Sequence, residues 1–423
     1  MHTNGRAETT IHVANDIPAK RHPSWEHMQV LDTEDRIVVG EAGTTTRAVA
    51  GRAFQPIRVG FLSDLPAGNQ LGEFLDPIIL AFEDAINEGR LRRPVELVPL
   101  HVHGLPVGTA QNVRRAYLDL VEQGCLLVLS TGLTDNSLAL RELVNETGVP
   151  FISMAGTTRF VGPHCFSLAN GGHGEEMAII AAYCASQGYR RVVVTGERSP
   201  GDTEYQAFFR EQAALYGLEI LKEHYFAQRP TEDELDKGFR QIRDLEPDAL
   251  VYAGFGWNSM QINPSLERVG WDPPKVMSAA IMWALRGDVW ADLLEGWIGI
   301  EQSIGDHENL EKNRNWGPAL DRFEKRFGYR KADTVFALLY DQGRAASEAI
   351  FHAPLLTGAG ISAGLERIKM MPSTLGGPRT YIEFGPENHR GYKGDFLFLK
   401  QLRKREFHFV TFHWPEWVSN RST

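Results

Sequence analysis

The amino-acid sequence predicts an α/β fold of two lobes, each a doubly wound parallel sheet. Short apolar runs alternate with amphipathic segments from Ile57 onwards, in the repeating order strand, helix, strand, helix. This repeat implies right-handed crossovers between parallel strands. The pattern restarts after residues 165–168, and 423 residues are enough for two or three domains. We therefore expect two lobes of similar size with a ligand cleft between them.

The first lobe is expected to begin with a strand in the stretch IRVGFLSDL, which starts at Ile57. The loop PAGNQLG leads into a helix that ends at Asn87-Glu88-Gly89, a sequence typical of a helix C-cap. The stretch VELVPLHVH predicts the next strand, and residues 108–121 have the spacing of an amphipathic helix. Upstream, residues 1–54 are polar, with a short predicted strand at 36–39.

Half of a small-molecule site is expected in the stretch VLSTGLTDNSLALRELVNETGVPFISMAGTT. Its two apolar runs, 125–129 and 149–154, each end in small polar residues. Between them lies a predicted helix, whose candidate N-caps are Thr134, Asp135 and Asn136. Both strands would bring hydroxyls and backbone amides to the carboxyl edge of the sheet, where open α/β folds bind ligands.

The second lobe repeats the alternation with strands in RRVVVTG, LEILKEHYF, DALVYAGFG and PKVMSAA, and with helices at 174–187, 202–216, 232–243 and 258–269. After Trp290 the chain changes character, because GWIGIEQS predicts a strand that crosses back to the first lobe. Further helices are expected at 316–327, 333–351 and 364–371. The stretch TYIEFGPENHRGYKGDFLFLKQL predicts two final strands paired as a hairpin around a turn-rich centre.

Composition excludes several classes of function. The net charge is -10 and the basic residues are scattered, so neither nucleic acid nor an anionic membrane surface is expected as a partner. Three cysteines are too few for a disulfide framework, and Cys125 and Cys184 are expected to be buried thiols. No apolar run is long enough to cross a membrane. The N-terminus lacks the pattern of a secretory signal, so the chain as written is expected in the cytoplasm, or in the periplasm or outside the cell if its natural leader is missing.

Sequence motifs predict neither a cofactor nor a metal. The stretch GFGWNS lacks the third glycine of a dinucleotide fingerprint, and no phosphate loop, HExxH, paired CxxC or GxSxG motif occurs. His101 and His103 are two apart on a predicted strand and share a face, but no third ligand accompanies them.

Several stretches together resemble the type I periplasmic binding proteins, the branched-chain amino-acid and amide-binding family. They are IRVGFLSDLPAG, STGLTDN, ISMAGTT, VYAGF, ALLYDQGRAA and FGPENHRGYKGDFLFLKQL, in the order and spacing of the family. The resemblance covers nearly everything from Ile57 to Val410. It implies two lobes joined by three crossings, near 168–170, 300–302 and Thr380. Lobe 1 would comprise 57–170 plus 302–380, and lobe 2 would comprise 171–301 plus 381–410, between a polar N-terminal extension at 1–54 and a C-terminal tail at 411–423.

The resemblance also implies the ligand-binding positions. In amino-acid-binding members, hydroxyls and amides of two loops hold the ligand carboxylate, and in this sequence those loops carry Thr134, Asp135, Ala155, Gly156 and Thr157. Alternatively, Thr134 and Asp135 cap the helix that follows them. The other matching positions are Leu71 at the mouth of the pocket, Pro200, Phe255 with Trp257 beyond it, and Trp283. For Met282 and Trp283, core packing is the alternative.

Two departures from the family pattern argue against a zwitterionic amino acid as the ligand. Asp135 stands where a hydroxyl is common, and its carboxylate would repel a ligand carboxylate. Ala280 stands where an acidic residue commonly holds the ligand ammonium. Glu197 or Asp202 could replace that acid, although Asp202 is the better candidate for the cap of the next helix.

We therefore expect a non-enzymatic protein that closes two lobes on a small organic ligand with a polar head and an apolar body. An amide, an aromatic or aliphatic acid, or an apolar amino-acid derivative would fit. Its partner would be an ABC permease or, for a cytoplasmic sensor of the amide-sensing type, a regulatory protein. A hydrolase built on Asp135 and His173 is the rival from another class, but no nucleophile, base and orienting group are organised in the sequence.

Overall fold

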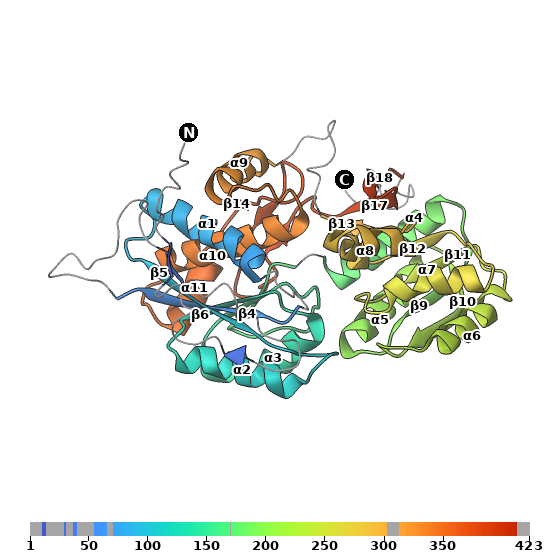
Figure 1. The fold of residues 1–423 in the computed structure, drawn as a ribbon, viewed down its shortest axis with the longest axis horizontal. Coiled ribbons are helices and arrows are strands. Elements are labelled where there is room, and N and C mark those ends of the chain that lie inside the picture. Colours follow the sequence, from blue (N-terminus) through green and yellow to red (C-terminus); the bar gives the residue numbers. More distant parts are fainter. Residues whose placement is uncertain are drawn as a thin grey trace, which may run out of the picture. The chain divides into compact units, whose positions relative to one another are not determined.

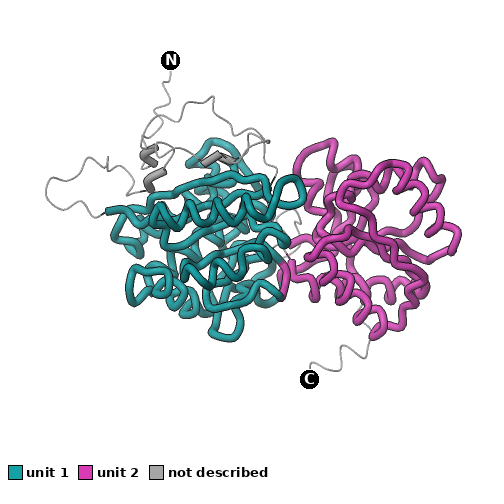
Figure 2. Tube along the Cα trace, turned by 90° about the horizontal axis from the view of Figure 1, so that it is seen from below, with its two compact units in different colours: residues 1–155, 159–169, 311–395 teal, residues 156–158, 170–310, 396–423 magenta. Residues whose placement is uncertain are grey.

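The computed structural model describes residues 11–13, 29–30, 37–39, 55–65, 71–169, 171–302 and 313–412. The chain divides into two compact units, shown in Figure 2. Unit 1 comprises residues 1–155, 159–169 and 311–395, and unit 2 comprises 156–158, 170–310 and 396–423.

The sheet of unit 1 has the strand order β1-β3-β5-β4-β6-β7-β8, and β2 pairs with β5. The strands from β4 to β8 run parallel, whereas β1, β2 and β3 add antiparallel pairs at one side. Their bounds are Ile11–Val13 (β1), Gln29–Val30 (β2), Ile37–Val39 (β3), Ile57–Ser63 (β4), Val95–His101 (β5), Leu127–Ser130 (β6), Phe151–Ser153 (β7) and Cys165–Ser167 (β8). The strand predicted at 36–39 is thus confirmed.

Helices cover both faces of this sheet (Figure 1). On one face, α2 and α3 pack on an apolar core that includes Leu62, Val98 and Tyr117. On the other, α1 packs along α10, and a Cβ at Gly343 of α10 would lie 2.7 Å from Cβ of Ala81 in α1, so this close approach requires glycine. The helices are Leu71–Asn87 (α1), Ala110–Glu122 (α2), Thr134–Thr147 (α3), Trp316–Phe327 (α9), Thr334–His352 (α10) and Gly358–Glu366 (α11).

The sheet of unit 2 has the order β10-β9-β11-β12-β13-β17-β18. The first five strands are parallel, and β17 and β18 pair antiparallel at the edge. The strands are Arg191–Glu197 (β9), Glu219–Phe226 (β10), Ala249–Tyr252 (β11), Lys275–Met277 (β12), Ile298–Glu301 (β13), Phe398–Arg403 (β17) and Glu406–Phe409 (β18). The helices are His173–Ser186 (α4), Pro200–Leu215 (α5), Glu232–Arg243 (α6), Ser259–Arg268 (α7), the 3-10 helix Ala279–Arg286 (η3) and Asp288–Leu293 (α8).

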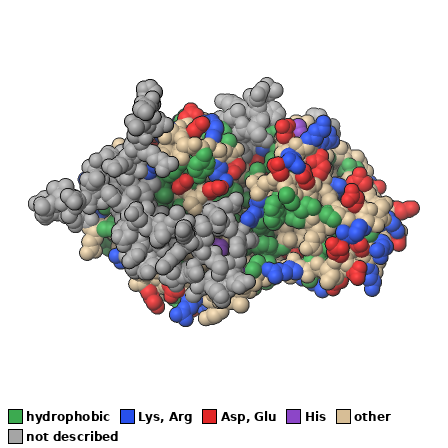
Figure 3. Space-filling model, viewed as in Figure 1, with side chains coloured by type: hydrophobic (Ala, Val, Ile, Leu, Met, Phe, Trp, Pro, Cys, Tyr) green, Lys and Arg blue, Asp and Glu red, His purple; other side chains and the backbone are tan. Residues whose placement is uncertain are grey.

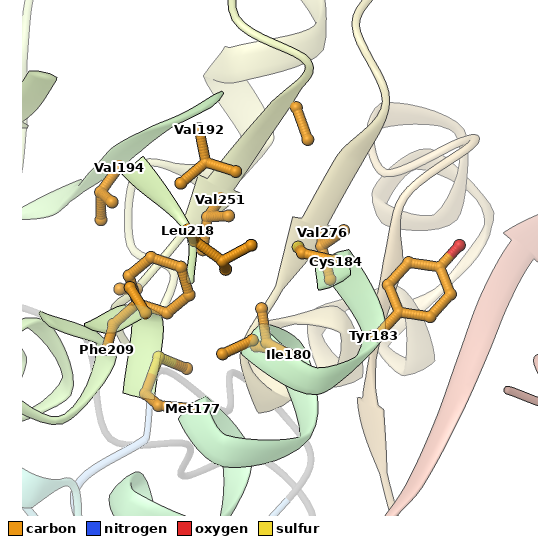
Figure 4. Close-up of a cluster of buried hydrophobic side chains, with 14 of the residues drawn as sticks. Met177, Ile180, Tyr183, Cys184, Val192, Val194, Phe209, Leu218, Val251 and Val276 are labelled. Carbon is orange, nitrogen blue, oxygen red and sulfur yellow. The ribbon is translucent and has the colours of Figure 1, made fainter. Parts of the chain in front are cut away.

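Cys184, predicted to be buried, lies in the apolar core of unit 2. Met177, Ile180 and Cys184 of α4 face the strand residues Val192 and Val251 (Figure 4). Burial raises the pKa of the Cys184 thiol to about 12, so the thiolate form that reacts is suppressed. All three cysteines are buried and free, which confirms the prediction for Cys125 and Cys184.

The strand and helix order confirms the predicted α/β fold with parallel sheets, but three local predictions are wrong. The two final strands do not pair as a hairpin: β15 (Tyr381–Ile382) pairs with β14 (Met371–Pro372) and β16 (Tyr392–Lys393), and β17 pairs with β13. The helix expected at 364–371 instead ends at Glu366, and Thr357 caps its start. The strand expected in PKVMSAA ends at Met277 and turns into η3.

The unit boundaries also differ from those that the family resemblance implies. Residues 381–395 belong to unit 1, because the backbone around His389 and Gly391 bonds to Ser167 of β8. The Ser167 amide donates to the His389 carbonyl at 2.9 Å, and the Gly391 amide donates to the Ser167 carbonyl at 2.8 Å. Residues 156–158 belong to unit 2. Of the tail predicted at 411–423, residues 413–423 lie outside the described residues.

The surface in view carries acidic and basic side chains side by side, as the scattered charges of the sequence predict (Figure 3). In the same view hydrophobic side chains gather on the part of unit 2 that carries α7 and α8. Within the described ranges, none of the helices has the length and apolar character needed to span a membrane.

Candidate functional site

The N-terminus of α3 carries two of the predicted ligand positions, Thr134 and Asp135, as its first two residues. Neither caps the helix, and nor does Asn136, so that alternative is wrong. Leu133 occupies the N-cap position without a side-chain cap bond. No described residue hydrogen-bonds to the Thr134 hydroxyl.

Asp64, directly after β4, replaces the missing cap. Its Oδ2 accepts hydrogen bonds from the Leu133 amide and from Nδ2 of Asn136, both at 2.9 Å. Its Oδ1 accepts from the Thr131 hydroxyl at 2.7 Å. Burial raises the pKa of Asp64, and the hydrogen bonds from Thr131, Asn136 and Leu133 oppose that rise. Asp64 is not among the residues predicted from the sequence, although an acid directly after a strand at the carboxyl edge is a usable signal.

Serine hydroxyls lock the loop after β7 to α3. Ser137 Oγ and Ser153 Oγ are hydrogen-bonded at 2.7 Å, and the amide of the buried Ala155 donates to Ser153 Oγ at 2.9 Å. Gly132 has a left-handed φ of +41°, and a Cβ there would lie 2.4 Å from Ser153 Oγ. Only glycine therefore fits between these two loops.

The segment 156–158 binds a carboxylate of its own unit. Thr157 donates its hydroxyl to Oε2 of Glu204, and Thr158 donates both its hydroxyl and its amide, the latter at 2.8 Å, to Oε1. Nδ1 of His173 lies 3.1 Å from Oε2. A Cβ at Gly156 would lie 2.2 Å from the carbonyl oxygen of Gly171, so this position also requires glycine.

Burial of Glu204 raises its pKa, but the hydrogen bonds from His173, Thr157 and Thr158 outweigh burial and hold the pKa at about 2. A carboxylate accepts hydrogen bonds only, so Nδ1 of His173 carries a proton. The ring of His173 stacks on Tyr205, with ring centroids 3.8 Å apart. The Thr157 hydroxyl, predicted to contact ligand, is thus engaged within the protein.

Aromatic side chains gather at the carboxyl edge of the unit 2 sheet. Phe255 follows β11, and its ring lies edge-on to Trp283 of η3 with centroids 5.5 Å apart. Trp283 Nε1 donates to the Phe255 carbonyl at 3.1 Å. Trp257 lies 5.5 Å from Phe255 and 5.3 Å from Trp283, between ring centroids. Trp283 is buried, whereas Phe255 and Trp257 are partly exposed.

A second layer extends this cluster. Trp290 of α8 stacks on Trp283 with centroids 5.6 Å apart, and the Arg286 guanidinium lies 5.4 Å from the Trp283 ring and 5.2 Å from the Trp290 ring. Burial lowers the pKa of Arg286. The structure therefore brings the two predicted positions Phe255 and Trp283 together. Trp283 is also packed against Trp290, in agreement with the alternative prediction of core packing for this residue.

The two candidate acids of unit 2 are both built into its framework. Ser199, not Asp202, caps α5, since Ser199 accepts from the Asp202 amide at 3.0 Å. Asp202 Oδ1 accepts instead from the Phe255 amide at 2.9 Å. Glu197 is fully buried, and its Oε1 accepts from the Tyr252 hydroxyl and from the Asn258 amide at 2.9 Å. Ala280 is buried, and Pro200 is exposed as the first residue of α5.

The remaining predicted residues are spread through unit 1. Leu71 is the first residue of α1, after the loop that follows β4. His101 and His103 lie with ring centroids 5.5 Å apart, and burial, with a smaller contribution from the His103 charge, lowers the pKa of His101 to about 4. Within the described ranges, no group of three or more His, Cys, Asp or Glu side chains could hold a metal.

The rival hydrolase finds no support in the placement of its two residues. Asp135 belongs to unit 1 and His173 to unit 2. Nδ1 of His173 hydrogen-bonds to Oε2 of Glu204, a residue of its own unit.

A cavity of about 410 Å³ lies at the other edge of the unit 1 sheet. It is lined by residues at the amino ends of β4 and β6, among them Ile57, Arg58, Leu126 and, from neighbouring segments, Arg93 and Leu356. The predicted ligand loops lie at the carboxyl ends of these strands, so this cavity is separate from the candidate site.

A family of proteins described as periplasmic binding protein matches residues 56–400 of the chain. No curated protein sequence matches it. Among solved structures, the chain is similar to an ABC transporter substrate-binding protein from Desulfitobacterium hafniense in complex with Leu, with 16% identity and a TM-score of 0.66 over 84% of this chain and 100% of that one.

Two further solved structures share this fold. A leucine-binding protein from Thermotoga maritima has 15% identity and a TM-score of 0.68, covering 85% of this chain and 99% of its own. A solute-binding protein of an ABC transporter from R. palustris, in complex with benzoate, has 15% identity and a TM-score of 0.65, covering 85% of this chain and 97% of its own.

Proposed function

Because the chain belongs to the type I periplasmic binding protein family, we propose that it is the substrate-binding component of an ABC transporter of the branched-chain amino-acid and amide type. It binds a small organic ligand without chemical turnover. We place its site of action in the periplasm, where a family of this kind delivers ligand to a permease. Cell fractionation tests this location against the cytoplasm, and co-purification with a permease tests the transport role against that of a sensor.

The aromatic cluster of unit 2 is the observation that supports an apolar ligand body. Phe255 and Trp257 expose part of their rings at the carboxyl edge of the sheet, over a buried Trp283 that holds Phe255 by a hydrogen bond. Aromatic side chains bury large apolar areas and favour planar or branched apolar groups. Solved structures with this fold were obtained with Leu and with benzoate, two ligands that have such a body.

The polar head is expected to contact unit 1. The Thr134 hydroxyl has no hydrogen-bond partner among the described residues, and it lies at the N-terminus of α3 beside Asp135. Ala280 carries no acid to pair with a ligand ammonium, and Glu197 and Asp202 already accept hydrogen bonds from the backbone. This supports a ligand other than a zwitterionic amino acid.

The experiment is a calorimetric titration of the purified protein with leucine, benzoate, benzamide and branched aliphatic amides. For a bound member of this panel, we expect Phe255→Ala and Trp257→Ala each to weaken binding about tenfold or more, roughly 1.4 kcal/mol. The matched control is Trp271→Ala, a partly exposed tryptophan ahead of β12 at the opposite edge of the sheet. Equal affinity of all variants would reject the aromatic site, and conversion of the ligand, followed by NMR, would reject the non-enzymatic role.

A further inference from the structure

Four donors converge on the carboxylate of Glu204. They are the hydroxyls of Thr157 and Thr158, the Thr158 amide at 2.8 Å and Nδ1 of His173 at 3.1 Å. Each of the two carboxylate oxygens accepts two hydrogen bonds from these groups, which fills the hydrogen-bonding capacity of the carboxylate. We refer to Gly156, Thr157, Thr158 and His173 as the carboxylate grip.

The grip is held in shape by residues other than Glu204. Gly156 passes so close to Gly171 that no side chain would fit, and the His173 amide donates to the Gly156 carbonyl at 3.1 Å. His173 also stacks on Tyr205, whose hydroxyl donates to the fully buried Glu176 at 3.1 Å. Thr157 and His173 are 1% exposed, whereas Thr158 lies at the surface and forms the rim. The donors would therefore remain in place around another carboxylate.

We propose that Glu204 is a specificity residue, an internal carboxylate that occupies the grip and excludes the carboxylate of a ligand from it. This rests on the proposed function and on the family resemblance, which implies that Thr157 is a polar contact of the ligand in addition to Thr134. A ligand carboxylate at the grip would have to displace Glu204 or lie beside its negative charge. Neutral amides meet no such repulsion, so the protein selects an amide head group over the matching acid.

The first test examines the grip without any transport ligand. Glu204→Ala removes the internal carboxylate, and acetate, at constant ionic strength against chloride, is the probe for the vacated position. We expect 100 mM acetate to raise the unfolding temperature of Glu204→Ala by about 2–4 °C. The wild type and the control Glu211→Ala, which removes an exposed carboxylate of the same helix, should shift equally little. No acetate effect specific to Glu204→Ala would overturn the grip.

The second test examines selectivity with a pair of ligands that differ only in the head group. We expect the wild type to bind benzamide at least tenfold more tightly than benzoate. Glu204→Gln keeps the size of the side chain and should reduce this ratio about tenfold by removing the charge. A wild type that prefers benzoate, or an unchanged ratio in Glu204→Gln, would overturn the exclusion. If neither compound binds, the proposed function fails for aromatic ligands, and the acetate test still decides whether Glu204 fills the grip.

Discussion

The side chain of Glu204 keeps its charge in a setting where burial alone would favour the neutral form. The hydrogen bonds from His173, Thr157 and Thr158 stabilise the ionised carboxylate, and its pKa falls from 4.5 to about 2. A carboxyl group whose pKa is lower in the folded than in the unfolded state stabilises the fold above the unfolded pKa. That contribution is lost as the pH falls from about 4.5 to about 2.

We therefore predict that Glu204→Gln flattens the acid destabilisation of the protein. The wild type should lose stability steeply between pH 4.5 and pH 2, whereas the variant lacks the group responsible for part of that loss. Urea unfolding midpoints at pH 6, 4 and 3 measure the effect. Glu211→Gln serves as the control and should follow the wild type. Parallel pH profiles for all three proteins would contradict the assignment.

The same residue shows why single positions were hard to assign from sequence. Thr134 and Thr157 are both threonines after a strand at the carboxyl edge, and the sequence offers no difference between them. Their environments differ, because Glu204 lies 47 residues from Thr157 in the chain and yet binds its hydroxyl. No described residue binds the Thr134 hydroxyl in this way.

Among the elements, β13 and β17 are joined by a buried ion pair as well as by their backbones. Nζ of Lys400 lies 2.7 Å from Oε2 of Glu301, and the two side chains are 1% and 2% exposed. The Lys400 ammonium also lies 5.0 Å from the centre of the Phe409 ring. Because both charges are removed from water, replacing either partner alone is expected to destabilise the fold strongly.

We predict that Lys400→Met lowers the free energy of unfolding by about 3–5 kcal/mol, because Glu301 would remain buried after losing the Lys400 ammonium. The double variant Lys400→Met, Glu301→Leu should recover most of this loss. Arg403→Met, an exposed change on the same strand, is the control. Chemical denaturation measures these proteins and the single variant Glu301→Leu. A double variant whose loss equals the sum of the two single losses would show that the pair is not coupled.

Element order could be predicted from the sequence, but the pairing of the last strands could not. The stretches that contain residues 381–382 and 398–403 both have the residue pattern of strands, and a turn-rich segment lies between them. Such a pattern favours a hairpin. In the structure the two strands belong to different units, since β17 finds its partner in β13, about a hundred residues earlier in the chain.

For the whole molecule, the two units and the family membership lead to a prediction of closure. A ligand that contacts both units favours the conformation in which both contacts are made, by its difference in affinity between open and closed states. We expect small-angle X-ray scattering to record a smaller radius of gyration at saturating ligand. The Trp257→Ala variant should need correspondingly more ligand for the same change. Binding without any change in the radius would contradict closure.

The sequence by itself determined the fold class, the alternation of parallel strands with helices in both units, the burial of Cys125 and Cys184, and the family. These features depend on local periodicity and on the order of motifs, which the chain carries in linear form. Only the tertiary structure decided the hydrogen-bond partner of each site residue. Asp64 accepts a hydrogen bond from the Leu133 amide at the start of α3, 69 residues away, and Glu204 accepts one from the Thr157 hydroxyl. Hydrogen bonds and charges act over a few ångströms in space, so their partners follow from the packing of distant segments and not from neighbouring residues.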